Sequence, residues 1–164
     1  MNLPLNMEMS PAGFVETSYR ESWNVRSDEN QMWSWLNKTD TFVAGQVGPY
    51  TVEFQDHENP DNPRFAPGVL TNHYGPFLNA AGVIGEMREK SYRDLRYYYG
   101  SYVFFFSLVR PSRLQFFYDQ EKKVLTMQLD AFVKPWFQGI WMKGMRFFWP
   151  RFGRWMEKSN GKAP

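Results

Sequence analysis

Hydrophobic and polar side chains alternate over residues 14–25. Val15, Tyr19 and Trp23 fall on one face of an extended chain, and charged or small polar side chains fall on the other. This period of two is typical of a strand with one buried side and one solvent-facing side. The pattern therefore predicts a long, half-buried strand near the start of the chain.

Two short helices are predicted to follow this strand. Asp28 and Gln31 have the spacing of a helix-capping pair and stand directly before an apolar run, which indicates a helix of about three turns. A second helical segment is predicted over 39–44, before the Gly and Pro residues of 45–49 interrupt it.

The middle of the chain is dominated by strand signals. Segments rich in β-branched and aromatic residues are separated by turns, and in the last segment Leu125, Met127 and Leu129 alternate with polar residues. We predict an antiparallel meander with one covered face, and an exposed, mobile loop over the Pro-, Asn- and Asp-rich stretch 55–68. The predicted strands cover residues 50–54, 69–77, 82–90, 92–99, 102–109, 113–119 and 124–133.

The last thirty residues carry a helical pattern. Large apolar side chains recur at spacings of 4, 3, 4 and 3, and the basic residues fall largely outside this stripe. We predict a long C-terminal helix opened by Pro135, with a kink near Phe147 because Pro150 lacks a backbone donor. The stripe consists of Trp141, Met145, Phe148, Phe152 and Trp155.

The order of these predicted elements is that of an α+β fold. One face of the curved sheet is apolar and has to be covered, so we expect the long helix to lie across the concave face. Neither an internal repeat nor a Ser- or Gly-rich linker divides the sequence. We therefore expect residues 1–164 to form a single domain with an ordered core over about 13–158.

The element order, the strand-to-helix passage over 25–36, the Gly85-Glu86 pair and the Arg-Pro-Ser-Arg-Leu segment 110–114 resemble the SRPBCC superfamily. That superfamily includes START domains, polyketide cyclases and coenzyme-Q-binding proteins. The resemblance implies a helix-grip fold: a curved antiparallel sheet wrapped around a long C-terminal helix, with an internal cavity that binds a hydrophobic molecule. The long loop 55–68 and the basic, aromatic C-terminal helix depart from a simple lipid carrier.

Composition agrees with one globular domain. The chain is 43% hydrophobic and 22% charged, and its aromatic fraction of 19% exceeds what core packing alone requires. The sequence has no apolar run of about 18 residues and no basic, then apolar, leader, so a cytoplasmic location is the expectation. With 0 Cys residues, disulfides and thiolate chemistry are excluded.

Charge is divided unevenly along the chain. Residues 1–133 contain 12 Lys and Arg against 16 Asp and Glu, whereas residues 134–164 contain 7 against 1. Three interpretations of this basic, aromatic segment stay open. It can form a helix that covers the sheet, make peripheral contact with an anionic membrane, or provide a surface for a protein partner of unknown kind. Nucleic-acid binding is disfavoured because the rest of the domain is acidic and carries no recognised RNA-binding signature.

Few residues suggest catalysis. No nucleophile elbow, phosphate-binding loop or dinucleotide fingerprint occurs, and no cofactor is expected. The two histidines, His57 and His73, do not have the spacing of a metal site, so no metal is expected either. His73 remains the candidate general base of a polyketide cyclase or aromatase-like enzyme, with a Tyr as its partner.

We predict that the domain binds or transports a hydrophobic small molecule, such as a lipid, an isoprenoid or a polyketide-like compound, between the sheet and the C-terminal helix. The cyclase-like enzyme and the membrane or protein-interaction module are the alternatives. The arginines near the cavity strands, Arg93, Arg96, Arg110 and Arg113, are expected to form surface ion pairs. The predicted cavity residues are Tyr97, Tyr99, Phe106, Met127, Trp141, Met145 and Phe148.

Overall fold

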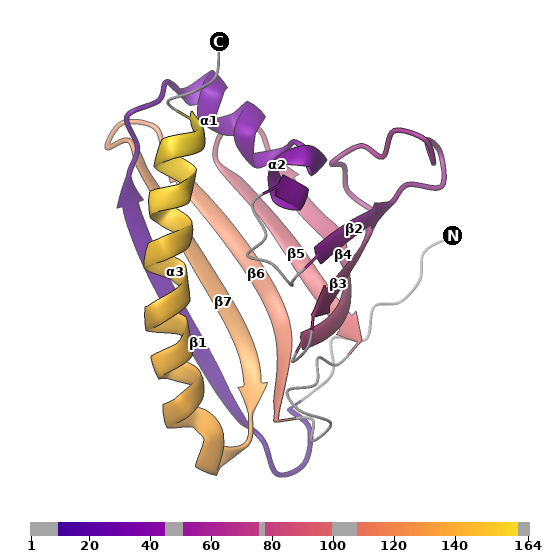
Figure 1. Ribbon diagram of the computed structural model, residues 1–164, viewed down its shortest axis with the longest axis vertical. Helices are drawn as coiled ribbons and strands as arrows, with labels where there is room; N and C mark the ends of the chain where they lie inside the picture. The colour runs from indigo at the N-terminus through magenta and orange to yellow at the C-terminus, as the bar shows by residue number, and fades with distance from the viewer. Residues whose placement is uncertain (1–9, 45–50, 76–77, 100–107, 161–164) are drawn as a thin grey trace.

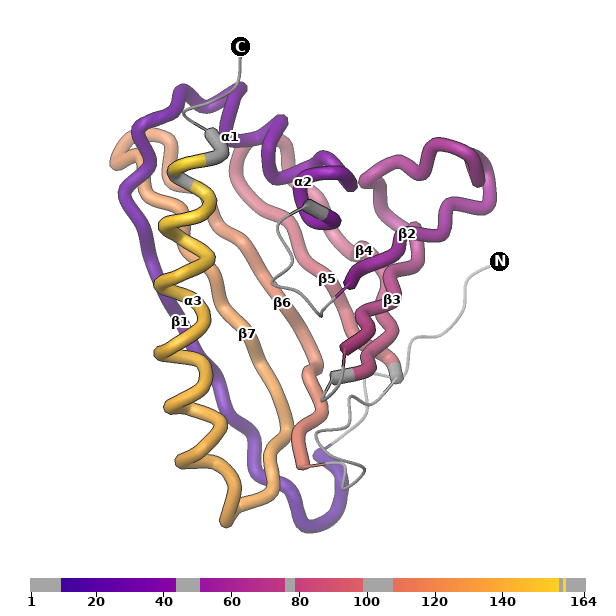
Figure 2. The backbone as a smooth tube through the Cα atoms, viewed as in Figure 1, coloured from indigo at the N-terminus to yellow at the C-terminus, as the bar shows by residue number. Residues whose placement is uncertain are grey.

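One antiparallel sheet of seven strands, in the order β1-β7-β6-β5-β4-β3-β2, forms the frame of the protein. The computed structural model describes residues 10–44, 51–75, 78–99 and 108–160. Figures 1 and 2 show the sheet curving around the side on which the helices lie; we call this side the inner face. The elements are β1 (Val15–Asn24), α1 (Glu29–Leu36), α2 (Thr39–Ala44), β2 (Thr51–Gln55), β3 (Leu70–Gly75), β4 (Leu78–Arg88), β5 (Tyr92–Tyr99), β6 (Val109–Asp119), β7 (Val124–Val133), the short 3-10 turn η1 (Pro135–Phe137) and α3 (Gln138–Asn160).

The predicted fold class is confirmed, including the two short helices after the first strand and the long C-terminal helix. Two predicted boundaries are wrong: β4 begins at Leu78, four residues before the strand predicted over 82–90, and the division predicted within β6 is absent. β6 runs without a break from Val109 to Asp119, because Pro111 is accommodated at a register shift against β7, where a missing backbone donor costs little. Residues 102–107, where a separate strand was predicted, lie outside the described part of the chain.

The core lies between the sheet and α3. Figure 1 shows α3 running along the inner face over β1 and β7. Its apolar stripe meets a cluster of rings from the first strand and first helix: Phe152 lies 5.9 Å from Trp23 and 6.0 Å from Trp35, and Trp155 lies 5.3 Å from Trp35, between ring centroids. α3 continues through Pro150 to its end. Among the described helices, none combines the length and apolar character that crossing a bilayer requires.

A buried carboxylate holds the central strands together on the opposite, outer face. Asp94 of β5 is 0% exposed and accepts hydrogen bonds from the Glu86 backbone N–H at 2.6 Å, Arg113 Nε at 2.7 Å and Arg96 Nε at 3.1 Å. Gly85 is required beside it, because a Cβ at this position would overlap the Asp94 carboxylate. The network thus fixes β5 between β4 and β6.

An internal ion pair closes the loop before β3. Asp56 is buried there and accepts hydrogen bonds from Arg64 through Nε at 2.7 Å and Nη2 at 3.2 Å. The Arg64 guanidinium holds the pKa of Asp56 well below its usual range. This clasp closes the loop and brings Phe65 to within 5.6 Å of Phe42 and 5.7 Å of Phe54, between ring centroids. Most of the loop is exposed, as predicted, but Asp56 is buried and Phe65 is half-buried against Phe42 and Phe54.

The close approach of α3 to β1 can be tested at two glycines of the same helix. A Cβ at Gly153 would overlap the Trp23 indole, whereas a Cβ at Gly144 would meet nothing within 4 Å. We expect Gly153→Ala to lower the free energy of unfolding by about 1–3 kcal/mol through overpacking. Gly144→Ala should instead raise it by about 0.5–1 kcal/mol through helix propensity. Urea unfolding of both variants measures the difference; equal effects would contradict this packing.

Candidate functional site

The side chain of Arg93 lies on the inner face because successive side chains of β5 alternate between the two faces of the sheet. Because Asp94 points to the outer face, its neighbours Arg93 and Leu95 point inward, and so does Tyr97. The register agrees, since Arg93 pairs with the core residue Phe116 of β6. The sequence-based expectation that Arg93 forms a surface ion pair is wrong: its side chain lies under α2 and the loop before β3. Arg96 and Arg113 do form ion pairs, but with a buried partner.

Arg93 is 3% exposed and surrounded by phenyl rings. Its guanidinium carbon lies 4.3 Å from the ring centroid of Phe42, 4.5 Å from that of Phe65 and 4.5 Å from that of Phe116. Its Nε and Nη2 atoms are buried and have no hydrogen-bond partner among the described residues. Burial lowers the pKa of Arg93 to about 9, so the group is still a cation at neutral pH.

This arrangement is costly in the free protein. A cation over an aromatic face gains about 0.5–2 kcal/mol, whereas removing an unpaired charge from water costs several kcal/mol. Two buried donors without acceptors add about 1–3 kcal/mol each. Buried charges in proteins are ordinarily paired, so Arg93 is unusual in a way that points to a function.

Three further polar groups lie on the same face. The rings of His73 in β3 and Tyr97 are 5.6 Å apart between centroids, and Thr71 shares its row of the sheet with Gly82 and Tyr97. His73 Nε2 and Thr71 Oγ1 are buried and lack a hydrogen-bond partner in the described structure. Burial lowers the pKa of His73 to about 4 and raises that of Tyr97, so both are neutral at physiological pH.

The predicted cavity residues fall into two groups. Met127 is fully buried in the core, whereas Tyr97 and, on α3, Trp141, Met145 and Phe148 are half-buried at its edge. The side chain of Tyr99 and the whole of Phe106 lie outside what the structure describes. That these residues contact a ligand stays a prediction.

Sequence reasoning missed Arg93 and Thr71. The signal for Arg93 was present, because it stands four residues before the predicted cavity residue Tyr97 in the same strand and therefore faces the same side of the sheet. Its burial depends on Phe42 and Phe65, two residues far away in the sequence that no local pattern connects with it. Thr71 gave no signal, since a hydroxyl in a strand is ordinary.

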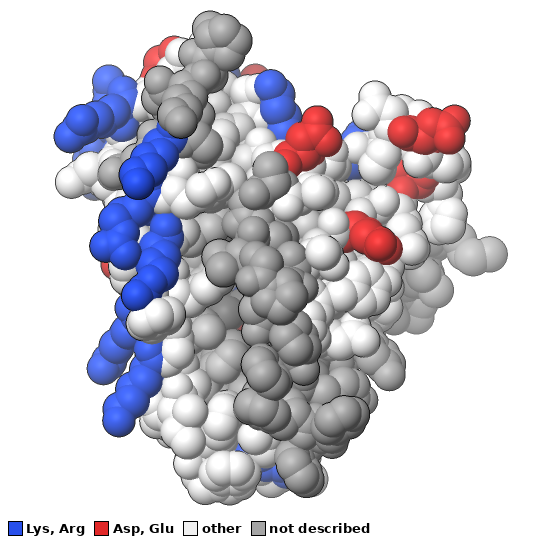
Figure 3. All heavy atoms as spheres, viewed as in Figure 1, with Lys and Arg blue, Asp and Glu red and all other residues white. Residues whose placement is uncertain are grey.

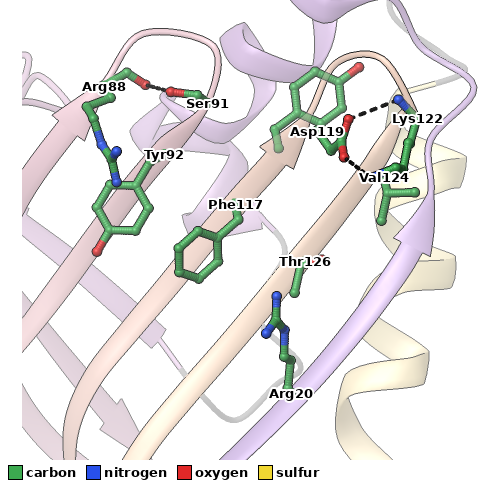
Figure 4. Close-up of a pocket in the computed structure, with 10 residues that line it drawn as sticks. Arg20, Arg88, Ser91, Tyr92, Phe117, Asp119, Lys122, Val124 and Thr126 are labelled. Carbon is green, nitrogen blue, oxygen red and sulfur yellow. Dashed lines mark hydrogen bonds and ion pairs between the residues drawn. The ribbon is translucent and has the colours of Figure 1, made fainter.

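A pocket of about 470 Å³ lies on the outer face of the sheet, away from these polar groups. Figure 4 shows Arg20, Phe117 and Tyr92 side by side across the strands that form it. The Arg88 guanidinium carbon stands 4.5 Å from the Tyr92 ring centroid. This pocket is therefore not the predicted cavity between the sheet and α3.

No metal centre is evident in the described residues, which contain no group of three or more His, Asp or Glu side chains placed to hold an ion. His57 is exposed in the loop, next to the buried Asp56. The carboxylate of Asp56 is already occupied by Arg64.

Comparisons with solved structures identify the fold. Norcoclaurine synthase from Thalictrum flavum superposes with a TM-score of 0.66 at 10% sequence identity, over 99% of this chain and 94% of that one. The Mll3558 protein from Rhizobium loti gives 0.59 at 9% identity, over 88% of this chain and 98% of that one. The chain has the helix-grip fold. No protein-family profile and no curated protein sequence matches this helix-grip domain.

A third similar structure is the major latex-like protein 151 from Panax ginseng, with a TM-score of 0.50 at 9% identity over 71% of this chain and 78% of that one. Identities this low establish a shared fold and leave function to be argued from the site. Norcoclaurine synthase is an enzyme by name, whereas the name of the major latex-like protein states no activity.

The burial of His73 predicts a dependence of stability on pH. The unfolded chain binds a proton at a pKa near 6.5 and the folded chain at about 4, so the unfolded state holds more protons between these values. The contribution is present above pH 6.5 and is lost as the pH falls toward 4, by up to about 3 kcal/mol. Urea unfolding of the wild type and His73→Leu from pH 7 to 4 measures it.

The variant should lack this part of the pH dependence, and the exposed His57→Gln should keep the wild-type profile. Parallel profiles for the wild type and His73→Leu would show that His73 is not buried as a neutral group.

Proposed function

We propose that this helix-grip domain binds a hydrophobic small molecule on its inner face. The observation that carries the proposal is a group of buried polar atoms without partners, on Thr71, His73 and Arg93, within an otherwise apolar surface. Ligand sites are mostly apolar with a few polar groups that fix orientation. A ligand that satisfies these atoms would recover the free energy that their burial costs.

The apolar part of the site has a physical basis in the half-buried residues at the edge of the core. Leu114 and Tyr97 present it from the sheet, and Trp141, Met145 and Phe148 present it from α3. Burying such side chains against a ligand contributes about 25 cal/mol per Å² of apolar surface. Binding would therefore be driven by apolar contact and oriented by the polar groups.

The structural relatives support a small-molecule ligand. Norcoclaurine synthase, in a second structure with a TM-score of 0.53 at 11% identity over 85% of this chain and 80% of that one, was determined in complex with dopamine and hydroxybenzaldehyde. That protein is an enzyme by name, and His73 beside Tyr97 would suit proton transfer in a cyclase-like reaction. Turnover that His73→Ala abolishes while binding persists would assign the domain to the enzymes.

Two neighbouring phenylalanines of α3 provide a matched test of binding. Phe148 is half-buried at the proposed site, whereas Phe147 is 63% exposed on the solvent-facing side of the helix. Phe148→Asp should abolish saturable binding of the neutral apolar dye Nile red, followed by fluorescence, because a charge then stands in the apolar wall. Phe147→Asp should leave it unchanged. Undiminished dye binding by a folded Phe148→Asp variant, with the fold checked by circular dichroism, would refute the site.

We further propose that the exposed face of α3 contacts an anionic membrane. Lys143, Arg151, Arg154 and Lys158 recur at spacings of 3 to 8 on this face, and Figure 3 shows the basic side chains gathered along the helix. Exposed apolar side chains accompany them, namely Trp136 at 69%, Ile140 at 57% and Phe147 at 63% exposure. Cations with exposed aromatic residues are typical of helices that lie at a lipid surface.

This contact predicts binding that depends on charge and salt. Wild-type protein should sediment with vesicles containing phosphatidylglycerol, and Lys143→Glu/Arg151→Glu/Arg154→Glu should lose most of this binding, since each cation near an anionic surface contributes about 1 kcal/mol. The control Arg20→Glu/Arg88→Glu/Lys122→Glu makes the same change in net charge on the outer face and should bind better than the α3 variant. Equal losses in both variants would exclude α3 as the contact surface.

A further inference from the structure

Three arginines in this fold can be compared by the atoms with which they meet a carboxylate. Arg64 uses Nε and Nη2 on Asp56, at 2.7 and 3.2 Å, and Arg113 uses Nε and Nη2 on Asp94, at 2.7 and 2.6 Å. These two atoms lie on one edge of the guanidinium, with parallel N–H bonds that match the two oxygens of a carboxylate. Arg64 thus forms a fork with both oxygens of Asp56, whereas Arg113 directs both nitrogens toward one oxygen, Oδ2 of Asp94, and also donates from Nη2 to the Tyr92 hydroxyl at 2.7 Å.

Arg93 presents the same fork without an acid. In Arg93, the Nε and Nη2 atoms are buried and have no hydrogen-bond partner among the described residues. These are the same two atoms that face a carboxylate in Arg64 and Arg113. The three phenyl rings of Phe42, Phe65 and Phe116 surround the guanidinium, and among the described residues no carboxylate forms an ion pair with it. The stretches 45–50, 76–77 and 100–107, which lie outside the description, contain no Asp or Glu. Among the described side chains, this edge of Arg93 therefore has no counterion.

We propose that Arg93 receives the carboxylate of an acidic, amphipathic ligand through Nε and Nη2. This inference rests on the proposed function and narrows its ligand to a molecule with an acid at one end and an apolar body. The body would lie along the inner face of β5, past Leu95 to Tyr97, a span of about 13 Å for four residues of a strand. Saturated chains of about ten carbons have this length.

The rings over Arg93 suit an acid of this kind. They exclude water from the guanidinium, and a charge-assisted hydrogen bond is stronger in an apolar surrounding than in water. Phe42 belongs to α2 and Phe65 to the loop closed by the Asp56 clasp, so both rings stand on short elements outside the main sheet. A ligand could reach Arg93 by displacing these rings without breaking strand pairing.

The test compares two probes that differ only in the headgroup, decanoic acid and 1-decanol, by isothermal titration calorimetry at pH 7.5 with the wild type and with Arg93→Met. Met is close in size, flexible and apolar. The wild type should bind the acid at least about tenfold more tightly than the alcohol. Arg93→Met should lose this preference and keep its affinity for the alcohol. Arg88→Met, which removes an exposed cation from the outer face, should bind both probes as the wild type does.

A second readout separates a ligand site from a structural role. If Arg93 serves the ligand, Arg93→Met removes an unpaired buried charge and should raise the melting temperature of the ligand-free protein by at least about 2–4 °C. Retained preference for the acid in Arg93→Met, or a lower melting temperature with unchanged affinities, overturns the inference and leaves the proposed function intact. Failure of the wild type to bind either probe overturns both.

Discussion

The burial of Asp94 on the outer face is the constraint on which the inner face depends. Its carboxylate takes hydrogen bonds from β4, β5 and β6 at once, through the Glu86 backbone, Arg96 and Arg113. Shifting β5 by one residue would bring this charge to the core side and leave it unpaired, which is prohibitive. Because successive side chains alternate, the same constraint turns Arg93 and Tyr97 inward. The polar inner face is thus a consequence of the register that Asp94 imposes.

Apolar packing and the proposed binding site occupy different parts of the inner face. Near α3 and α1, rings such as Trp35, Phe152 and Trp155 fill the space between helix and sheet and supply apolar burial. Toward α2 and β3, burial includes polar atoms that have no partner, on Thr71, His73 and Arg93. The first region can carry the cost of the second, as is common where a binding site is built into a stable frame.

The two faces of the long helix α3 differ. Its buried stripe completes the core, and its exposed face carries cations beside Trp136 and Phe147. If that face meets a membrane, the same helix that bounds the proposed ligand site also stands at the source of an apolar ligand. Because a shared fold does not establish a shared function, the function of this chain has to be argued from these side chains.

The sequence by itself determined the fold class, most strand boundaries and both faces of α3, because these follow from periodicities of two and of about 3.6 residues. It also placed Tyr97 on the inner face, although it separated β6 at Pro111, where a register shift absorbs the missing donor. The burial of Arg93 was decided only by tertiary structure. The rings that surround it come from α2, from the loop closed by Asp56 and from β6, and contact between segments so distant in sequence leaves no local pattern. That no described side chain pairs with Arg93 Nε and Nη2 is likewise a property of the assembled face.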